Sequence, residues 1–491
     1  MPETLPEIVF ASADSTESKK ISRWVKSGML RKMLPRVYTS NFEDSDETIV
    51  RRNLYPILGG LYPDAVLSHR TALEAGPTAS NEIFLTYPYK RTVELPGITV
   101  RLLKGPGALD DDMPFLGNLF MASRHRAFLE NLQVSRGNSS TSKVLPRPAL
   151  EERLERICQS QGEEALNQLR DRARLTAQEL GLATEFEKFN KIVGAILRTR
   201  PAGALESPEA RARSHGVPYD ARRLDLFNAL FAELGKVDLP ILRRESLSDD
   251  ELQRLAFFEA YFSNYIEGTE FEIDEARKIV FENKIPERRP QDAHDIMGTY
   301  RIAVSRDEMR KLPSTPNAFL RILKARHHMI MEARPEKLPG EFKFESNRAG
   351  STHFVAPEMV EGTLRKGFEM SQAVVAGMPR AIFIMFVVAE VHPFVDGNGR
   401  VARAMMNAEL VSQRECRIMI PIVYRDDYLL ALRALSRRSD PTPLIKALVR
   451  AQEFCAALPL DSYEHTHSVL SLCNAFKEPD EGRLIIPSTA N

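Results

Sequence analysis

The stretch VHPFVDGNGRVARAMM, Val391–Met406, joins two segments with helical character. Before it, Pro379 stands near the start of the apolar run AIFIMFVVA (Ala381–Ala389), which is typical of a buried helix. That helix is predicted to end before Pro393, because a residue that precedes proline avoids the helical conformation. The spacing in RVARAMMNAELV, from Arg400, predicts a second helix. The polar residues between the two helices therefore lie in a loop.

The loop has the composition of an anion-binding site. Gly397, Asn398 and Gly399 accept left-handed backbone angles, so backbone N–H groups are expected to face one point at the start of the second helix. Arg400 and Arg403 lie three residues apart, and their guanidinium groups match phosphate oxygens. The pattern therefore predicts phosphate binding.

Two further side chains add chemistry to the loop. Asp396 is a hard oxygen ligand beside the expected phosphates, where Mg²⁺ is usually bound. His392 can take a proton from a hydroxyl near neutral pH. Together these residues predict transfer of a phosphate-containing group to an alcohol. The alternative is a capped helix corner with His392 bonded to the backbone and both arginines solvated.

The string resembles the motif of the Fic family, H-P-F-x-[D/E]-G-N-G-R-x-x-R, at every defining position. The resemblance covers about Asp249 to Cys455. It implies a mainly α fold, a Fic-type helical bundle with a β-hairpin flap, and transfer of AMP from ATP to a protein hydroxyl. Transfer of another nucleotide, such as UMP, or of a phosphate stays open, because the motif recognises phosphates better than bases.

The resemblance implies a role for each loop residue. His392 would be the general base and Asp396 the magnesium ligand. Asn398, with the backbone of Gly397 and Gly399, would cradle the α- and β-phosphates. The target would be a protein that bears a serine, threonine or tyrosine.

Further residues would complete the nucleotide site. Arg400 would support the phosphates, and Arg403 would hold the γ-phosphate. Phe394 would anchor the loop from beneath. Tyr424 and Tyr428, in a segment that resembles the adenine side of the family's site, are the expected ring contacts or, equally, core residues.

A second stretch, FFEAYFSNYIEGTEFEIDEA, is predicted to be a helix that ends at Gly268. Ser263 and Glu267 share one face of it. The string S-x-x-x-E-G resembles the inhibitory motif of Fic proteins in which a glutamate pairs with the second motif arginine, here Arg403. The hypothesis is autoinhibition by Glu267. The alternatives are an ordinary helix end and a glutamate that also helps water to remove AMP.

A third stretch, Gly340–Pro357, alternates, turns at Arg348–Gly350 and alternates again, as a β-hairpin does. By its position in the family it is interpreted as a flap that pairs with a target segment through its edge. A hairpin without a binding role is the alternative.

The predicted domains are 1–135, an α+β module; 136–148, a linker; 149–248, a helical connection; 249–456, the catalytic domain with its inhibitory helix; and 457–491, a loosely attached tail. The linker prediction rests on SRGNSSTSKVLPRP (Ser135–Pro148). In the first module, ISRWVKSGMLRKM (Ile21–Met33) predicts an amphipathic helix, while NEIFLTYP and ITVRLLKG predict strands.

The first helix is locally basic, and with the following RVYTS it resembles the recognition helix and wing of abortive-infection antitoxins of winged-helix type. DNA contact through phosphates is one interpretation, and a protein-binding or scaffolding role is the other. A DNA-binding regulator with a vestigial Fic domain is therefore the alternative function. The presence of His392, Asp396 and Arg403 favours the enzyme.

Composition bounds these predictions. The 491 residues include 67 basic and 67 acidic side chains, so nothing indicates binding to nucleic acid or membrane by net charge. Four scattered cysteines and a first segment unlike a signal peptide favour the cytoplasm. The longest apolar run is too short to span a membrane. The oligomeric state stays open.

Overall fold

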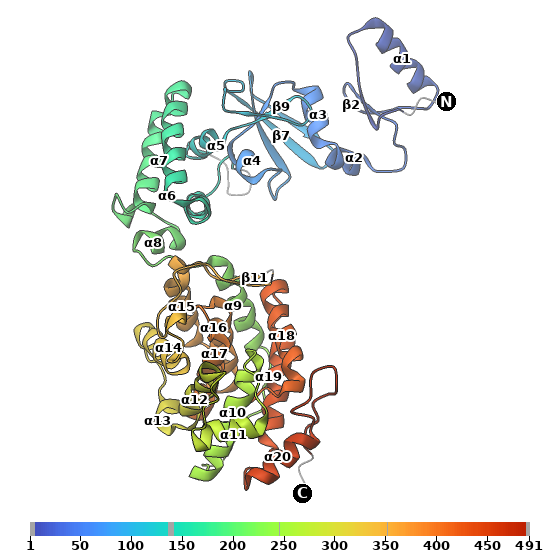
Figure 1. Ribbon diagram of the computed structural model, residues 1–491. Helices are drawn as coiled ribbons and strands as arrows, with labels where there is room; N and C mark the ends of the chain where they lie inside the picture. Colours follow the sequence, from blue (N-terminus) through green and yellow to red (C-terminus); the bar gives the residue numbers. More distant parts are fainter. Residues whose placement is uncertain (1–4, 136–141, 245, 351, 488–491) are drawn as a thin grey trace. The chain divides into compact units, whose positions relative to one another are not determined.

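The computed structural model describes residues 5–135, 142–244, 246–350 and 352–487. The chain divides into two compact units, Met1–His215 and Gly216–Asn491, which we describe one at a time (Figure 1). The helical connection predicted for 149–248 is shared between them, because its first helices belong to the first unit and its last helix to the second.

The first unit contains a three-stranded sheet, order β1-β3-β2, and a six-stranded sheet, order β6-β7-β5-β4-β9-β8. Its α-helices and strands are β1 (Ile8–Phe10), α1 (Ser15–Lys26), β2 (Arg31–Leu34), β3 (Val37–Thr39), α2 (Asp46–Arg52), α3 (Leu54–Leu61), β4 (Val66–Leu67), α4 (His69–Glu74), β5 (Glu82–Tyr87), β6 (Arg91–Leu95), β7 (Ile98–Lys104), β8 (Met113–Phe115), β9 (Leu119–Met121), α5 (Arg124–Asn131), α6 (Arg147–Leu180), α7 (Ala183–Ile196) and α8 (Pro208–Ser214).

The two predicted strands are β5 and β7, which pair in parallel. The helix predicted for Ile21–Met33 ends earlier than predicted: α1 stops at Lys26, and Gly28 adopts φ +74°. The residues that follow form strand β2, Arg31–Leu34, which pairs with β3. The winged-helix resemblance stays a prediction. Of the predicted linker, residues 136–141 lie outside the described part, and α6 already begins at Arg147.

The second unit is a helical bundle with one small hairpin, as the predicted fold class requires. Its α-helices and strands are α9 (Ala221–Leu234), α10 (Asp249–Ile266), α11 (Ile273–Glu282), α12 (Pro290–Val304), α13 (Arg306–Arg310), α14 (Pro316–Met331), β10 (Arg348–Ala349), β11 (Thr352–His353), α15 (Pro357–Ser371), α16 (Met378–Val391), α17 (Asn398–Ser412), α18 (Arg425–Arg438), α19 (Thr442–Ala456) and α20 (Tyr463–Leu472).

Helices α16 and α17 lie in the middle of this bundle (Figure 1). Nearly every residue of α16 is buried, which is why its sequence is apolar all round rather than on one face. Pro379 lies in its first turn, as predicted. The helix ends at Val391, and His392 caps it in the left-handed conformation at φ +52°. The loop that follows is thus held from both sides by core helices.

The hairpin is shorter than predicted. Arg348 pairs with His353 and Ala349 with Thr352, so each strand has only two residues. Arg348 and Ala349, predicted to lie in the turn, are therefore strand residues, and Ser351 is outside the described residues. Residues 340–347 form no strand, because side-chain bonds to the α16–α17 loop hold them instead.

The prediction of a loosely attached tail is wrong for most of 457–491. Helix α20 and the residues after it bury Leu470, Cys473, Ala475 and Leu484 in the bundle core. These apolar residues are few and lack a helical period, which is why the sequence did not reveal them. No helix in the described parts of the chain is both long enough and apolar enough to cross a membrane.

We predict that Leu470→Ala lowers the free energy of unfolding by about 2–4 kcal/mol, because it leaves a cavity in a fully buried position. Leu472→Ala is the matched control, since that side chain is 74% exposed on the same helix. Urea unfolding measures both. Equal effects of the two substitutions would show that α20 is not part of the core.

Candidate active site

The loop between α16 and α17 is closed by a single side chain. Asn398 accepts a hydrogen bond from the Phe394 backbone N–H at 2.9 Å and donates one to the Phe394 carbonyl at 3.0 Å. Its amide is therefore used inside the loop. This differs from the predicted role of the Asn398 side chain as part of a phosphate cradle, and it leaves the backbone of Gly397 and Gly399 for that purpose.

Phe394 is fully buried, as an anchor should be, and it stacks on His327 with ring centroids 3.7 Å apart. His327 Nδ1 accepts the Gly340 N–H, so Nε2 carries the proton and donates to the Asp396 carbonyl. Burial lowers the pKa of His327 to about 4, in keeping with a neutral ring. The sequence did not identify His327 as part of the site, although a histidine on the core-facing side of a helix could have indicated a contact with the loop.

His392 is poised to accept a proton. Its Nδ1 lies 3.3 Å from the Ala389 carbonyl, which can only accept, so Nδ1 donates and Nε2 keeps its lone pair. Its ring stacks on Phe354 with centroids 3.7 Å apart. Burial lowers the pKa of His392 to about 4, and the positive charge of Lys343 contributes in the same direction. The imidazole is therefore neutral at pH 7.

The flap segment is fastened to the loop. The Lys343 N–H donates to the Pro393 carbonyl, and the Asn347 amide donates to the Phe394 carbonyl. Lys343 Nζ in turn donates to Asn347 Oδ1 at 2.6 Å. Burial, with Arg223 nearby, lowers the pKa of Lys343 to about 8. The sequence predicted a flap here, but no pattern in it indicated that Lys343 or Asn347 would contact the loop.

Arg400 is buried and forms an ion pair with the buried carboxylate of Asp295. Its Nη1 lies 2.7 Å from Asp295 Oδ2 and donates to Asn264 Oδ1 at 3.2 Å. Asp295 also pairs with Arg334. Burial raises the pKa of Asp295, opposed by these two arginines. Arg400 thus supports the loop from the bundle side, through partners that the sequence did not indicate.

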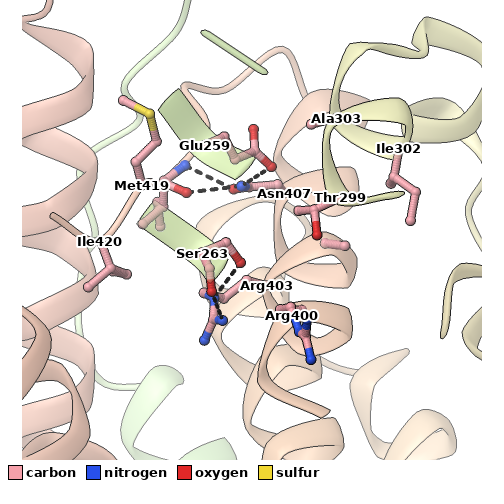
Figure 2. Close-up of a pocket in the computed structure, with 12 residues that line it drawn as sticks. Glu259, Ser263, Thr299, Ile302, Ala303, Arg400, Arg403, Asn407, Met419 and Ile420 are labelled. Carbon is pink, nitrogen blue, oxygen red and sulfur yellow. Dashed lines mark hydrogen bonds between the residues drawn. The ribbon is translucent and has the colours of Figure 1, made fainter. Parts of the chain in front are cut away.

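Arg403 is held by the end of α10 (Figure 2). Its Nε donates to Ser263 Oγ at 3.0 Å, and its Nη2 donates to the Ser263 carbonyl and to Glu267 Oε1, both at 2.8 Å. Burial opposes the charge, but the Glu267 carboxylate raises the pKa of Arg403. The cavity that both loop arginines line has a volume of only about 10 Å³, room for about one water molecule.

Glu267 also covers the first turn of α17. A Cβ atom on Gly399 would lie 2.1 Å from Glu267 Oε1, so the carboxylate rests on that glycine. Helix α10 ends at Ile266, two residues before the predicted Gly268, which adopts φ +84° where the chain turns away. The carboxylate thus lies at the point where an anion is favoured by the start of α17.

Asp396 is 40% exposed, and one of its oxygens accepts the Gly397 N–H at 2.6 Å. Within the described residues no group of three or more histidine, cysteine, aspartate or glutamate side chains could hold a metal ion. A single accessible carboxylate beside backbone N–H groups nevertheless fits Mg²⁺, which is commonly bound through one or two carboxylates together with substrate phosphates and water.

Tyr424 and Tyr428 lie deeper in the protein than contact with an adenine ring would require. Tyr428 is 1% exposed, and its hydroxyl bonds to Met385 and to Arg403. Tyr424 is buried as well. Of the two interpretations, the structure places both side chains in the core, with Tyr428 supporting Arg403.

The second unit is a helical bundle in which the α16–α17 loop and the start of α17 carry the histidine, glycines and arginines of the predicted motif. The model of the Fic/DOC family matches residues 319–410. A Fido domain-containing protein from Dictyostelium discoideum is 30% identical over 104 residues, which are 20% of this chain and 72% of that protein. The chain therefore belongs to the Fic/DOC family. Because this family's members are generally nucleotidyl or phosphate transferases, we describe it as a Fic-type enzyme.

Solved structures resemble it more distantly. Fic-1 (residues 134–508) from Caenorhabditis elegans is 17% identical, with a TM-score of 0.36, over 66% of this chain and 92% of that one. A Fic domain-containing signalling protein from Bacteroides thetaiotaomicron is 16% identical, with a TM-score of 0.35, over 47% of this chain and 95% of that one. The family assignment rests on the sequence matches.

We predict that the His392 ring titrates with a midpoint near pH 4, so that it stays neutral down to about pH 5. Phe354→Ala should move the pKa towards 6.5, because it opens the ring to water. NMR titration, with His392→Gln for assignment, measures this. Phe344→Ala is the control, since Phe344 is 70% exposed on the same segment. A wild-type midpoint near 6.5 would contradict the burial of His392.

Proposed function

We propose that the protein is an autoinhibited adenylyltransferase that transfers AMP from ATP to a hydroxyl side chain of a protein, including itself. The observation that carries the proposal is the neutral His392, with Nε2 free to accept a proton, at one end of a loop whose other end presents backbone N–H groups and Arg403. Asp396 and Val395 reach the surface, so the loop is accessible to a substrate.

In the proposed reaction, the target oxygen attacks the α-phosphorus of ATP while His392 Nε2 takes the hydroxyl proton. The bond from the α-phosphorus to the bridging oxygen breaks, and pyrophosphate leaves. The backbone at Gly397 and Gly399, together with Arg400, would offset the negative charge. Mg²⁺ held by Asp396 would neutralise the phosphates. The neutral state of His392 at pH 7 suits a general base.

The flap offers a place for the target. A cleft of about 300 Å³ lies between residues 336–347 and Val395, and Phe344 is exposed at it. Since β10 and β11 are only two residues long, target binding would depend more on this cleft than on extended strand pairing. Which protein binds there is set by side chains of the flap, such as Phe344 and Glu345.

Autoinhibition follows from the position of Glu267. Its carboxylate neutralises Arg403 and covers Gly399, where the γ-phosphate would need to lie. A triphosphate can therefore reach Arg403 only when Glu267 moves away.

One observation favours removal of AMP as a second activity of the same site. Only Oε1 of Glu267 bonds to Arg403, and its side chain is 24% exposed. The second oxygen has no hydrogen bond to another residue in the described part of the chain, and it can orient a water molecule towards a modified target. Glu267→Gly would remove this hydrolysis together with the inhibition.

We predict that Glu267→Gly raises self-modification with labelled ATP and Mg²⁺ about 10–100-fold, because Arg403 is released for the γ-phosphate. His392→Ala in the same background should lower it about 10²–10⁴-fold through loss of the base. Transfer of label from the α-phosphate to protein, followed by electrophoresis and mass spectrometry, is the measurement.

Glu270→Gly is the matched control, because Glu270 is an exposed glutamate three residues further on that makes no ion pair within the described chain. Label from UTP but not ATP would redirect the proposal to another nucleotide. No label from any nucleotide with Glu267→Gly, while the fold is intact, would contradict transferase activity and favour the vestigial alternative.

A further inference from the structure

The second unit has a wide cleft of about 720 Å³ away from the catalytic loop. It lies between residues 243–244 and 246–247, the first half of α10, the region of α13 and the end of α17 with the residues that follow. Its described lining includes one glutamate, Glu415, and six arginines: Arg243, Arg244, Arg306, Arg310, Arg414 and Arg417. Glu245 is outside the described residues.

Three of the arginines already have partners. Arg417 is buried and pairs with Glu259, while Arg244 donates to the carbonyls of Cys455, Ala456 and Leu458. Arg306 donates to the Leu247 carbonyl and pairs with Asp249. These three hold the walls of the cleft together.

The other three have free guanidinium groups. Arg243, Arg310 and Arg414 are exposed, and none of their side chains makes a hydrogen bond or an ion pair within the described chain. The Glu415 carboxylate interacts electrostatically with Arg243, but the described lining holds six arginines against one glutamate, and this excess of positive charge raises the local potential and favours anions.

The backbone brings two of these residues together. Residue 243 forms an antiparallel bridge with Glu415, and the Arg244 N–H donates to the Arg414 carbonyl at 3.3 Å. Arg414 also adopts φ +58° directly after the end of α17, where glycine would avoid the cost of about 1 kcal/mol. A long cation thus occupies a strained position at the edge of the cleft.

Part of the lining is apolar, formed by Leu247, Leu252, Leu255 and Val411. The volume falls within the range of small-molecule sites, and guanidinium groups match phosphate oxygens in a bidentate manner. We propose that this cleft binds a nucleoside polyphosphate, with its phosphates on Arg243, Arg310 and Arg414 and its base against the leucines. A concave site of this size fits such a ligand better than an extended nucleic-acid backbone.

The cleft is separate from the candidate active site. Helix α17 begins at the catalytic loop with Asn398 and ends near the cleft with Ser412. Its 15 residues span about 22 Å at 1.5 Å each. The inference therefore does not depend on the proposed transfer reaction.

The test compares two triple variants of the full chain. One carries Arg243→Gln, Arg310→Gln and Arg414→Gln. The matched control carries Arg288→Gln, Arg321→Gln and Arg438→Gln, three exposed arginines of the same unit that have no partner within the described residues. Both change the net charge equally. Calorimetry with inorganic tripolyphosphate and with GTP, in EDTA, measures binding.

We expect the wild type and the control to bind both probes with similar affinity and the cleft variant to bind at least about 30-fold more weakly. Arg310→Glu alone should also weaken binding, which covers the case of a poorly folded triple variant. Absence of wild-type binding, equal losses in both triple variants, or an unchanged cleft variant would overturn the site. An RNA or DNA oligonucleotide that binds tenfold more tightly than GTP, and only with the cleft arginines, would overturn the ligand class.

Discussion

The closure of the α16–α17 loop by Asn398 is the interaction on which the rest of the site depends. Buried backbone groups must be paired, and the Phe394 N–H and carbonyl have no helix or strand to pair them. The Asn398 amide satisfies both groups. With Phe394 fixed, His392 and Gly397 stand on either side of it at set positions, each in the left-handed conformation. The imidazole and the anion-binding turn are therefore positioned without the help of a ligand.

Buried charge is the second constraint. Arg400 and Arg403 are almost inaccessible, and a buried guanidinium without a partner is strongly unfavourable. Arg400 is neutralised by Asp295, which is also held by Arg334. Arg403 is neutralised by Glu267, on the side where a phosphate would lie. The two arginines of the motif thus have different surroundings, because Asp295 is 1% exposed beside Arg400 whereas the Glu267 side chain beside Arg403 is 24% exposed.

The sequence predicted those parts of the site that local chemistry determines. The end of α16 and the start of α17 follow from proline, glycine and helical spacing within short stretches, whereas the Ser263–Glu267–Arg403 contact was predicted only through the resemblance to an inhibitory motif. Partners from distant stretches were not predicted: His327 under Phe394, Asp295 beside Arg400, and Asn347 on the loop. Each comes from an element whose own sequence shows only an ordinary polar residue.

Errors of prediction have more than one origin. The predicted helix Ile21–Met33 is cut short by Gly28 and by pairing of β2 with β3, which no helical period reveals. The predicted hairpin Gly340–Pro357 loses most of its strands, because Lys343 and Asn347 bond to the loop instead, and two of its predicted turn residues, Arg348 and Ala349, form a strand. A glycine and a short local hairpin ended the helix in the first case, and contacts with the distant α16–α17 loop replaced the strands in the second.

If Glu267 acts as proposed, its placement accounts for a contact that holds in the resting protein and can be replaced by a phosphate. As the C-cap of α10 the carboxylate lies at the negative end of its own helix, which is unfavourable by about 0.3–1 kcal/mol. The start of α17 and Arg403 offset this through the same carboxylate. A triphosphate offers more negative charge to Arg403 and to the start of α17 without the unfavourable end of α10. Replacement of Glu267 by a phosphate would therefore remove the unfavourable interaction between the carboxylate and the negative end of α10. Arg403 would be paired with a negative group both before and after this replacement, so its buried charge would be compensated throughout.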